Sequence, residues 1–386
     1  MSIKNFIHLL IISLVLFILG LLPGCKQDVI SVDTPTPQEP FPSLSTNFTN
    51  TPLPVQSLVL NPTKTITLIP SGTINFTHTP MPSLTISPNV TQATRYQLTF
   101  ISNQHEGYDG LYAIDISCLD SNNPCFSNPK LLFEVPKKGV GPRVPITSYS
   151  WSPDGQQIAI DATGIEGHGD IFVGTWDGRN WRNLTISPSS EWNPIWSSDG
   201  KRTAYLANPD PSKEAVVFST NPDGKDLSQI LNLPKGIYSI AYFSLSPDGK
   251  QIAFTANVTS FYYQLFTSNL DGSELRQLTN TDDNYYSPAF SEDGLYILCV
   301  RGKDNPDKSS LVMIKIDSGE VYNITMESQN YQLSPSWSPV GNWIAFSSDY
   351  DGNYNIYLIK SDGTNLIEIT KAISDDFSPS WRVIKN

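Results

Sequence analysis

One short sequence mark recurs along this chain at nearly constant spacing. An aromatic residue or Leu is followed by Ser, a variable residue, Asp and Gly, in copies that begin at Trp151, Trp196, Leu245, Phe290 and, with Val in place of Asp, Trp337. Successive copies lie 45, 49, 45 and 47 residues apart, and Trp381 follows 44 residues later. A period of this size predicts a repeat architecture, in which each unit buries its apolar side against its neighbours.

Each unit contains short apolar segments that are separated by turn residues. In the last complete unit, strands are expected up to Trp337 and over residues 343–346, 355–359 and 366–370. Four short strands joined by tight turns are the make-up of one propeller blade. Gly closes the first turn in all five marks because the next strand starts from a positive φ, which Gly adopts without strain. Asp is absent only at Val340.

The two ends of the repeat region complete each other. Residues 96–133 contain three expected strands but lack the one that opens a unit, whereas residues 374–384 contain an opening strand with nothing after it. Joining them makes one blade from both ends of the chain and closes the ring. The sequence therefore predicts an all-β fold: a six-bladed β-propeller of four-stranded antiparallel blades, the first blade closed by the C-terminal strand.

The repeat resembles a known family. Ser334-Pro-Ser-Trp-Ser-Pro and Asn355-Ile-Tyr-Leu-Ile-Lys-Ser-Asp-Gly look like the WD40-like (PD40) propeller repeat of the TolB family, over essentially the whole of residues 96–386. The resemblance implies the propeller fold and leaves function open, because unrelated functions share one fold. TolB proteins also carry an N-terminal α/β domain for the Tol-Pal envelope system, which the sequence here replaces with a Pro- and Thr-rich stretch.

The first residues predict export. Lys4 precedes an apolar run over residues 6–22, which ends at Leu22-Pro-Gly-Cys25, and this order is typical of a secretory signal. A Cys directly after Leu-x-Gly resembles the bacterial lipobox, which implies a lipoprotein whose Cys25 is the lipidation site. The alternative is an uncleaved transmembrane helix, for which about 17 apolar residues is the lower limit. Acyl chains would anchor the protein to a bacterial membrane, facing the periplasm or the cell surface.

Three segments are expected. Residues 1–24 form the signal peptide, residues 25–94 a lipid-anchored tether, and residues 95–386 the propeller. The second segment is dense in Pro, Thr, Ser and Asn and has few charges or aromatics. Such a composition cannot bury enough apolar surface to offset chain entropy, so this stretch is predicted to be disordered.

Net charge limits the possible partners. The whole chain carries −12, and because residues up to Arg95 contribute four basic and three acidic side chains, the remainder carries −13. A domain this acidic is a poor nucleic-acid binder, since phosphate neutralisation requires clustered Lys and Arg. Nucleic acid is therefore excluded as a partner, and cationic partners are favoured.

The remaining cysteines fit an exported protein. Cys118 and Cys125 bracket a short loop and form a candidate disulfide, which would contribute about 2–3 kcal/mol. Cys299 lies in an apolar run and is expected to be a buried strand residue.

No convincing catalytic, metal or cofactor site is found in the sequence. No Gly-x-Ser-x-Gly motif is present, and the repeat region contains only two histidines, His105 and His168, both expected in solvated loops. The Asp349–Gly352 segment has the wrong Gly position for a calcium loop and is predicted to be a hairpin turn. The paired carboxylates Asp282-Asp283 and Asp375-Asp376 are expected to be solvated loop residues, although such pairs can serve glycoside chemistry.

Strand order places the candidate binding residues on one face. In a four-strand meander the tight turns share one face, while the irregular loops and the blade-to-blade connections share the other, and binding residues concentrate on such loops. That face carries aromatic residues beside acids, and we predict that these form the binding face: Glu191, Trp192, Asp283, Tyr285, Tyr286, Asp376 and Phe377. The alternative for each aromatic residue is packing between blades.

The sequence favours a non-enzymatic binding module, displayed outside the cytoplasm from a membrane anchor, that holds a protein, peptide or glycan on the irregular-loop face. Two alternatives remain open. One is a carbohydrate-active hydrolase or lyase with carboxylates in the propeller funnel, and the other is a periplasmic assembly or scaffold protein with a TolB-like role.

Overall fold

The computed structural model describes residues 67–68, 95–105, 108–119, 121, 123–134, 143–163, 168–209, 214–231, 233, 236–258, 262–302, 309–326, 330–340, 342–371 and 373–384. The predicted signal peptide, Cys25 and nearly all of the predicted tether lie outside these residues. Within them, no helix has the length and apolarity that a membrane span requires.

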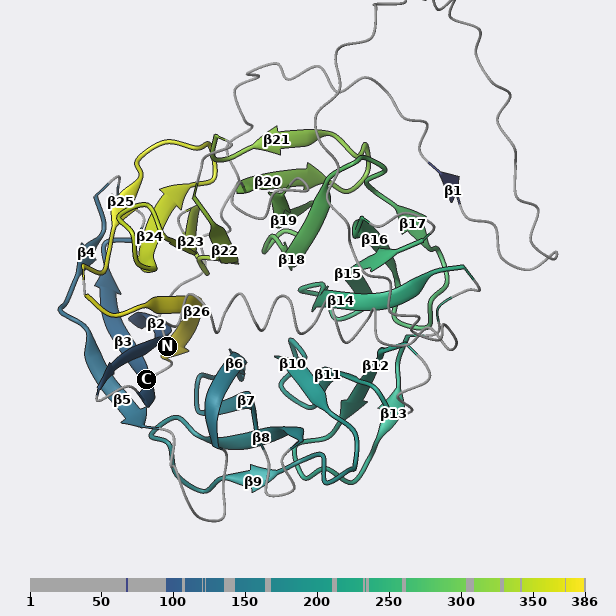
Figure 1. Cartoon of the computed structure of the whole chain (residues 1–386), viewed down its shortest axis with the longest axis horizontal. Coiled ribbons are helices and arrows are strands. Elements are labelled where there is room, and N and C mark those ends of the chain that lie inside the picture. Colours follow the sequence, from purple (N-terminus) through teal and green to yellow (C-terminus); the bar gives the residue numbers. More distant parts are fainter. Residues whose placement is uncertain are drawn as a thin grey trace, which may run out of the picture. The chain divides into compact units, whose positions relative to one another are not determined.

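The described strands form six antiparallel sheets arranged as a ring of blades (Figure 1). Blade 1 contains β26 (Asp376–Ile384), β2 (Arg95–His105), β3 (Tyr108–Ser117), β4 (Cys125–Phe126) and β5 (Lys130–Glu134). Blade 2 contains β6 (Arg143–Trp151), β7 (Gln157–Thr163), β8 (Gly169–Thr175) and β9 (Arg182–Asn183). Blade 3 contains β10 (Glu191–Trp196), β11 (Thr203–Ala207), β12 (Val216–Thr220) and β13 (Ser228–Gln229).

The other three blades repeat this order from the centre outward. Blade 4 contains β14 (Tyr238–Leu245), β15 (Gln251–Asn257), β16 (Gln264–Asn269) and β17 (Arg276–Gln277). Blade 5 contains β18 (Asn284–Phe290), β19 (Tyr296–Gly302), β20 (Ser309–Lys315) and β21 (Val321–Asn323). Blade 6 contains β22 (Gln332–Trp337), β23 (Trp343–Ser348), β24 (Asn355–Lys360) and β25 (Ile367–Glu368). The predicted six-bladed, all-β fold is confirmed.

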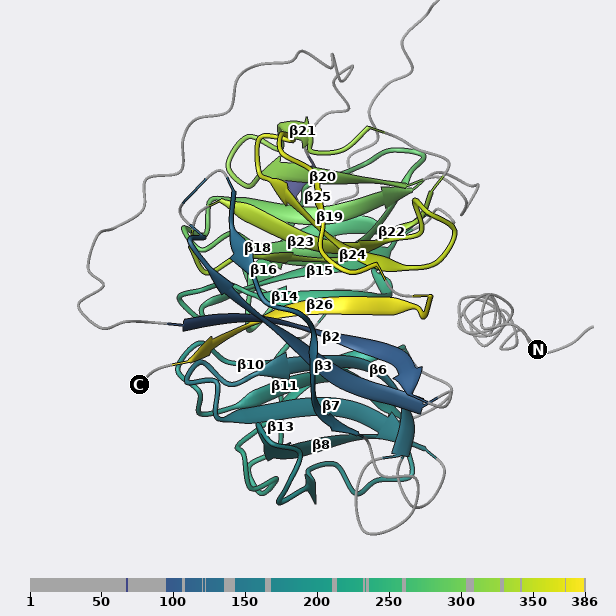
Figure 2. The ribbon, with the colours of Figure 1, turned by 90° about the vertical axis from the view of Figure 1, so that its left-hand side faces the viewer.

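The C-terminal strand closes the ring as predicted. β26 pairs antiparallel with β2, from Arg95 opposite Ile384 to Ser102 opposite Asp376. Figure 2 shows the two strands side by side, with the C-terminal end of the chain next to the start of β2. Blade 1 is therefore assembled from two segments at opposite ends of the repeat region.

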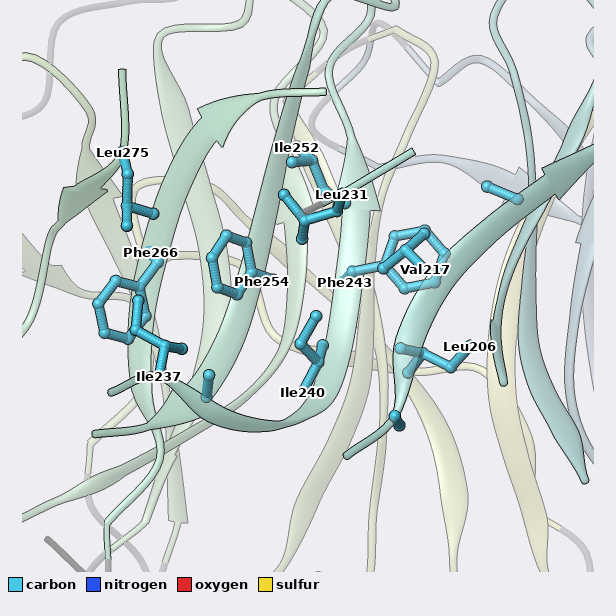
Figure 3. Packing of buried hydrophobic residues seen from close by; sticks show 13 residues of the cluster. Leu206, Val217, Leu231, Ile237, Ile240, Phe243, Ile252, Phe254, Phe266 and Leu275 are labelled. Carbon is cyan, nitrogen blue, oxygen red and sulfur yellow. The ribbon is translucent and has the colours of Figure 1, made fainter. Parts of the chain in front are cut away.

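Six apolar clusters hold the ring together, one at each interface between neighbouring blades. Figure 3 shows the cluster between blades 3 and 4, where Leu206 and Val217 meet Phe243 and Phe254. The rings of Phe254 and Phe266 stack with their centres 5.5 Å apart. Successive side chains of the second and third strands point to opposite faces of the blade, and both faces are apolar. Each blade therefore supplies side chains to two clusters.

The recurring mark is a hydrogen-bonded turn in which Ser matters as much as Gly. In four turns the Ser hydroxyl donates to the Asp carboxylate at 2.6–2.7 Å: Ser152, Ser197, Ser246 and Ser291. The same oxygen accepts the N–H that starts the next strand, as in Ser152 with Gln157 at 2.9 Å. Ser338 keeps this second bond, to Trp343 at 3.0 Å, although Val340 replaces Asp. The turn therefore needs Ser and Gly and tolerates loss of Asp.

Blade 1 departs from the expected loop pattern. β2 and β3 extend to His105 and Tyr108, which pair with each other, so His105 lies in a strand and not in the predicted loop. The antiparallel pairing of β2 with β3 continues up to the residues where the chain reverses direction. β4 adds a second short strand on β3 beside β5. In addition, β1 (Thr67–Leu68) pairs in parallel with β17 in blade 4.

Candidate functional site

The six blades present two chemically different surfaces. The turn face carries the tight turns that join the first strand to the second and the third to the fourth. The loop face carries the connections from the second strand to the third and from each blade to the next. On the turn face the acids have partners: Asp199, Asp223 and Asp248 each lie within 4.0 Å of a Lys two residues later. Turn chemistry accounts for these acids without a ligand.

One position near the loop-face end of each innermost strand is buried. It stands five residues before the aromatic residue or Leu of the recurring mark, or before Trp381 in blade 1: Ile146, Glu191, Ile240, Tyr285, Gln332 and Asp376. None is more than 3% exposed. This position therefore points between blades, whatever the residue type.

The next paired position of the innermost strand is half-buried, and we call these residues the inner ring. In five blades they pair with the second-strand residue directly before the partner of the buried position: Trp192, Tyr242, Tyr286, Leu333 and Phe377. The rings of Tyr242 and Tyr286, from neighbouring blades, meet edge to face with their centres 6.1 Å apart. Figure 1 shows the innermost strands around the propeller axis, so the inner-ring residues lie on strands that surround this axis. Trp192, Phe377 and Tyr286 also pack against the apolar clusters between blades.

A β-bulge after the inner ring fixes which side chain takes which position. Asn193, Ser287, Ser334 and Ser378 have φ between 49° and 54° at the register shift, and each is followed by Pro. Pro is tolerated here because the innermost strand is the free edge of its sheet, where a missing N–H leaves no ladder bond unmade. The recurring Ser/Asn-Pro pair was the available sequence signal for this bulge.

The structure separates the sequence-predicted site residues into two groups. Trp192, Tyr286 and Phe377 belong to the inner ring, and their partial exposure leaves surface for a ligand. Tyr285 is fully buried, in the cluster between blades 4 and 5, so its expected role as an exposed anchor is wrong. Strand alternation is the reason, because neighbours in a strand point to opposite faces. Sequence reasoning missed Tyr242, whose strand is irregular, and Leu333, which is not aromatic.

Glu191 and Asp376, two acids of the predicted binding face, are buried between blades. Both Ser187 and Ser189 donate hydroxyl hydrogen bonds to Oε1 of Glu191. Burial raises the pKa of Glu191, and these serines and Thr185 oppose that rise. Burial likewise raises the pKa of Asp376, opposed by Ser102, Thr370 and Gln104. Neither carboxylate oxygen of Asp376 makes a well-formed hydrogen bond to the described residues.

Blade 6 shows what a neutral residue does at the same position. Gln332 accepts a hydrogen bond from the Thr325 hydroxyl at 2.6 Å and donates one from Nε2 to the Tyr350 hydroxyl at 3.0 Å. Its amide is therefore paired at both ends without a charge to desolvate. Glu191 and Asp376 occupy equivalent places with a charge that burial disfavours.

We expect the double variant Glu191→Gln, Asp376→Asn to be more stable than the wild-type protein at pH 7, by about 1 kcal/mol for each unit by which burial raises a pKa. A carboxyl group whose pKa is raised by folding stabilises the fold below its unfolded pKa, near 4, and this contribution is lost as pH rises through the folded pKa. The advantage of the variant should therefore grow between about pH 4 and pH 7. Urea unfolding at several pH values measures it, and an advantage that is constant with pH would contradict the argument.

Asp283, the remaining acid of the predicted face, is engaged in an ion pair. Its carboxylate lies 3.9 Å from Nε of Arg301, and both side chains are less than 20% exposed. In each of the two predicted acid pairs, one carboxylate is already engaged. Asp283 is held in this ion pair, and Asp376 is buried. Neither pair presents two free carboxylates to a shared space, as glycoside chemistry requires.

A group of tyrosines extends the inner ring outward over blades 4 and 5. The ring centre of Tyr263 lies 6.2 Å from that of Tyr286, and Tyr238 is 48% exposed at the start of β14. Burial raises the pKa of Tyr242, Tyr263 and Tyr286, so all three remain neutral hydroxyl groups at physiological pH. This region offers flat aromatic surface together with hydroxyl donors.

The residue that sequence reasoning missed altogether is Asp161. Its buried carboxylate accepts backbone N–H bonds from Thr147 and Ser148 at 2.9 and 2.7 Å, and from Asn193 of the next blade at 3.1 Å. The hydroxyls of Thr147 and Ser148 donate to it as well. An acid within the apolar strand Gln157–Thr163 was the signal, because blades 3 to 6 have uncharged residues at the same position: Leu206, Thr255, Val300 and Ser347.

The described cysteines are free thiols. Cys118 and Cys125 lie in contact at the surface, where a hydrogen bond with Cys118 raises the pKa of Cys125. Their disulfide stays a prediction, which this proximity favours. Cys299 is fully buried in β19, as expected, and burial raises the pKa of its thiol. Among the described residues, no three His, Cys, Asp or Glu side chains gather as a metal site would require.

Comparison with known proteins gives one family. Residues 255–383, from β15 to β26, match the TolB β-propeller domain, PD40. A protein TolB homolog of Chlorobaculum tepidum is 31% identical over 121 residues, 31% of this chain and 27% of that protein. The Tol-Pal system protein TolB of Francisella tularensis subsp. tularensis is 25% identical over 305 residues, 75% of this chain and 63% of that protein. The chain thus spans less than two thirds of the length of these relatives.

Solved structures with this fold include two TolB structures. TolB from Acinetobacter baumannii superposes with a TM-score of 0.58 and 17% identity, over 74% of this chain and 66% of that one. Putative TolB from Agrobacterium tumefaciens gives 0.53 and 16%, over 76% of this chain and all of that one. At such identities the likeness concerns the fold alone. The repeat, the ring and the family match agree: this chain carries a six-bladed β-propeller that resembles those of TolB proteins, and its residues 255–383 match the PD40 model.

Proposed function

We propose that this chain is an exported, lipid-anchored propeller that binds a protein or peptide segment on its loop face, around the inner ring. The observation that carries the proposal is the inner ring itself. Five blades place an apolar side chain at one position of the innermost strand, and all five stay half-buried, although the neighbouring position in the same strands is fully buried. Trp192, Tyr286 and Phe377 contribute to the clusters between blades, yet each keeps exposed surface that is available to a ligand.

The chemistry of the loop face favours a protein or peptide ligand. Trp and Tyr provide large contact areas at small entropic cost and are enriched in protein interfaces. Exposed acids, Asp282 and Asp351, lie on the same face, and among the described cations there Arg301 is paired with Asp283 and Lys371 with Glu368. A segment with basic residues next to apolar ones would match both features.

The relatives support the same class of ligand. Those from Francisella are named as proteins of the Tol-Pal system, and a part in such a system implies contact with other components of it. An assembly or scaffold role in the cell envelope therefore follows for this chain as part of the proposal. Lipidation at Cys25 and the tether over residues 25–94 belong to it too, since they would hold the loop face within reach of envelope proteins.

The test begins with affinity purification of the full-length chain from its own membranes, followed by titration of the purified partner against variants. Tyr238→Ala and Phe377→Ala are each expected to weaken binding by about 1–3 kcal/mol, because they remove aromatic contact area. Tyr238 is the cleaner change, since its side chain is 48% exposed and contributes little to the core. Binding should also weaken with added salt.

Two charge reversals on the turn face, Asp223→Lys and Asp271→Lys, provide the matched controls. Like the loss of a loop-face acid, each change makes the protein less negative, but both residues lie on the opposite face. The affinity for the partner should therefore stay within about twofold of the wild-type value. If these changes abolish binding and the aromatic changes leave it intact, the wrong face has been chosen.

A further inference from the structure

Blade 2 differs from the other blades in its outer turn. Trp176 stands directly before the Asp of that turn, where the corresponding residues are Pro222, Leu270, Ile316 and Ser361. Its side chain is 41% exposed. Leaving that much of a Trp in water forfeits hydrophobic stabilisation, so turn formation gives no reason for this residue.

Trp176 is held in a fixed orientation. The guanidinium carbon of Arg382 lies 4.8 Å from the centre of its ring and 4.9 Å from that of Trp151. Arg382 is itself buried, donating from Nε to the Gly155 carbonyl at 2.8 Å and from Nη1 to Oε1 of Gln97 at 2.9 Å. The exposed Trp is therefore pre-organised by a rigid cation, which lowers the entropy that a ligand must remove on binding.

An open cavity of about 520 Å³ lies against this ring. Polar side chains dominate its lining: Gln156, Gln157, Thr175, Asp177, Asn180 and Arg182. The amide groups of Gln156 and Asn180 are exposed to solvent, while Arg182 donates to Oε1 of Gln157 at 3.3 Å. The cavity thus combines one aromatic surface with several groups that both donate and accept hydrogen bonds.

We propose that this cavity is a carbohydrate-binding site, in which Trp176 packs against the C–H face of one sugar ring while the amides bind its hydroxyls. A pyranose has an apolar face and a rim of groups that donate and accept, and Gln and Asn side chains match such a rim. Asp177 is paired with Arg179 at 3.4 Å, and Arg182 donates to Gln157. Both charges in the lining already have protein partners, which favours a neutral sugar over a phosphate or a uronate. The site lies on the turn face and is independent of the protein partner proposed for the loop face.

The experiment measures binding of the full-length chain, in a zwitterionic detergent free of sugar headgroups, to a glycan array that includes chitotriose, cellotriose and maltotriose. Bound sugars are then titrated by tryptophan fluorescence. Trp176→Ala should weaken binding at least tenfold, whereas Trp176→Phe, which keeps an aromatic surface, should retain most of it. Gln156→Ala and Asn180→Gly should each weaken it about threefold.

Several variants keep this result distinct from effects on folding. Gly suits the positive φ of Asn180, 52°, and Gln156 is exposed, so neither change should disturb the Arg382 contacts. Leu270→Ala, at the position of Trp176 in blade 4, is the matched control and should bind sugar as the wild-type protein does. Phe377→Ala should also leave sugar binding unchanged, because it belongs to the loop face.

The proposal is overturned if no glycan on the array binds, or if Trp176→Ala, Gln156→Ala and Asn180→Gly all bind sugar with wild-type affinity. If Trp176→Ala unfolds, the two amide variants decide alone. If no protein partner is recovered but sugar binds, the loop-face proposal fails and this one stands.

Discussion

Deletion of residues 375–386 is expected to abolish cooperative folding of the whole propeller. β26 pairs along most of its length with β2, and Trp381 is packed in the cluster between blades 6 and 1. Phe377 packs against the cluster between blades 1 and 2, so the deletion opens two interfaces. Loss of a buried Trp alone costs about 3–5 kcal/mol, and a whole domain is stable by only about 5–15 kcal/mol.

Thermal unfolding followed by near-ultraviolet circular dichroism, together with limited proteolysis, measures this effect. The truncated chain should show no cooperative transition, and it should associate, because the freed edge of β2 presents unpaired backbone groups. Deletion of residues 385–386 alone is the control, since β26 ends at Ile384. A truncated protein with the wild-type midpoint and protease resistance would mean that the closing strand is dispensable.

Gly155→Ala is expected to destabilise the protein by about 3 kcal/mol. Gly155 has a φ of 67°, and a Cβ there would lie 2.1 Å from the carbonyl oxygen of Val383 in the closing strand. The positive φ costs about 1–2 kcal/mol for Ala, and displacing a backbone carbonyl adds an overpacking cost of about 1–3 kcal/mol. The carbonyl of Gly155 also accepts the buried Arg382 hydrogen bond, which the same displacement would strain.

Gly200→Ala isolates the contribution of the closing strand. Gly200 occupies the same turn in blade 3 with a φ of 70°, but the nearest atom to its Cβ would be Cδ of Pro153 at 3.5 Å. This variant should lose only the conformational cost, about 1–2 kcal/mol. Guanidinium unfolding of both variants gives the comparison, and equal losses would show that β26 shifts freely to make room.

Local chemistry explains why much of the fold could be predicted from sequence. The Ser-x-Asp-Gly turn is formed by bonds within six residues, such as Ser152 to Asp154 and Gln157, so each copy is visible without any distant contact. The apolar second strands between these turns predicted the blades. The incomplete units at both ends of the repeat region predicted that β26 closes the ring. Blade number follows from counting such marks.

The candidate site was harder to predict because exposure depends on neighbours that are distant in sequence. Tyr285 and Tyr286 are adjacent and identical in type, yet one is fully buried and the other half-buried. Glu191 and Asp376 looked like surface acids beside aromatic residues, and the adjacent blade buries both. An aromatic–acid pattern in a connection is compatible with either role, since sequence alone carries no information on which side of a strand the next blade covers.

The sequence by itself determined the all-β class, the six blades, the position of the tight turns and the shared first blade, because each depends on turn chemistry and periodicity within one unit. Only the tertiary structure decided which side of each innermost strand faces solvent, and that Asp161 joins two blades through Asn193. It also brought Arg382 to Trp151 and Trp176, more than two hundred residues earlier. Closing the ring creates these contacts, and ring closure is a property of the whole chain that no single repeat encodes.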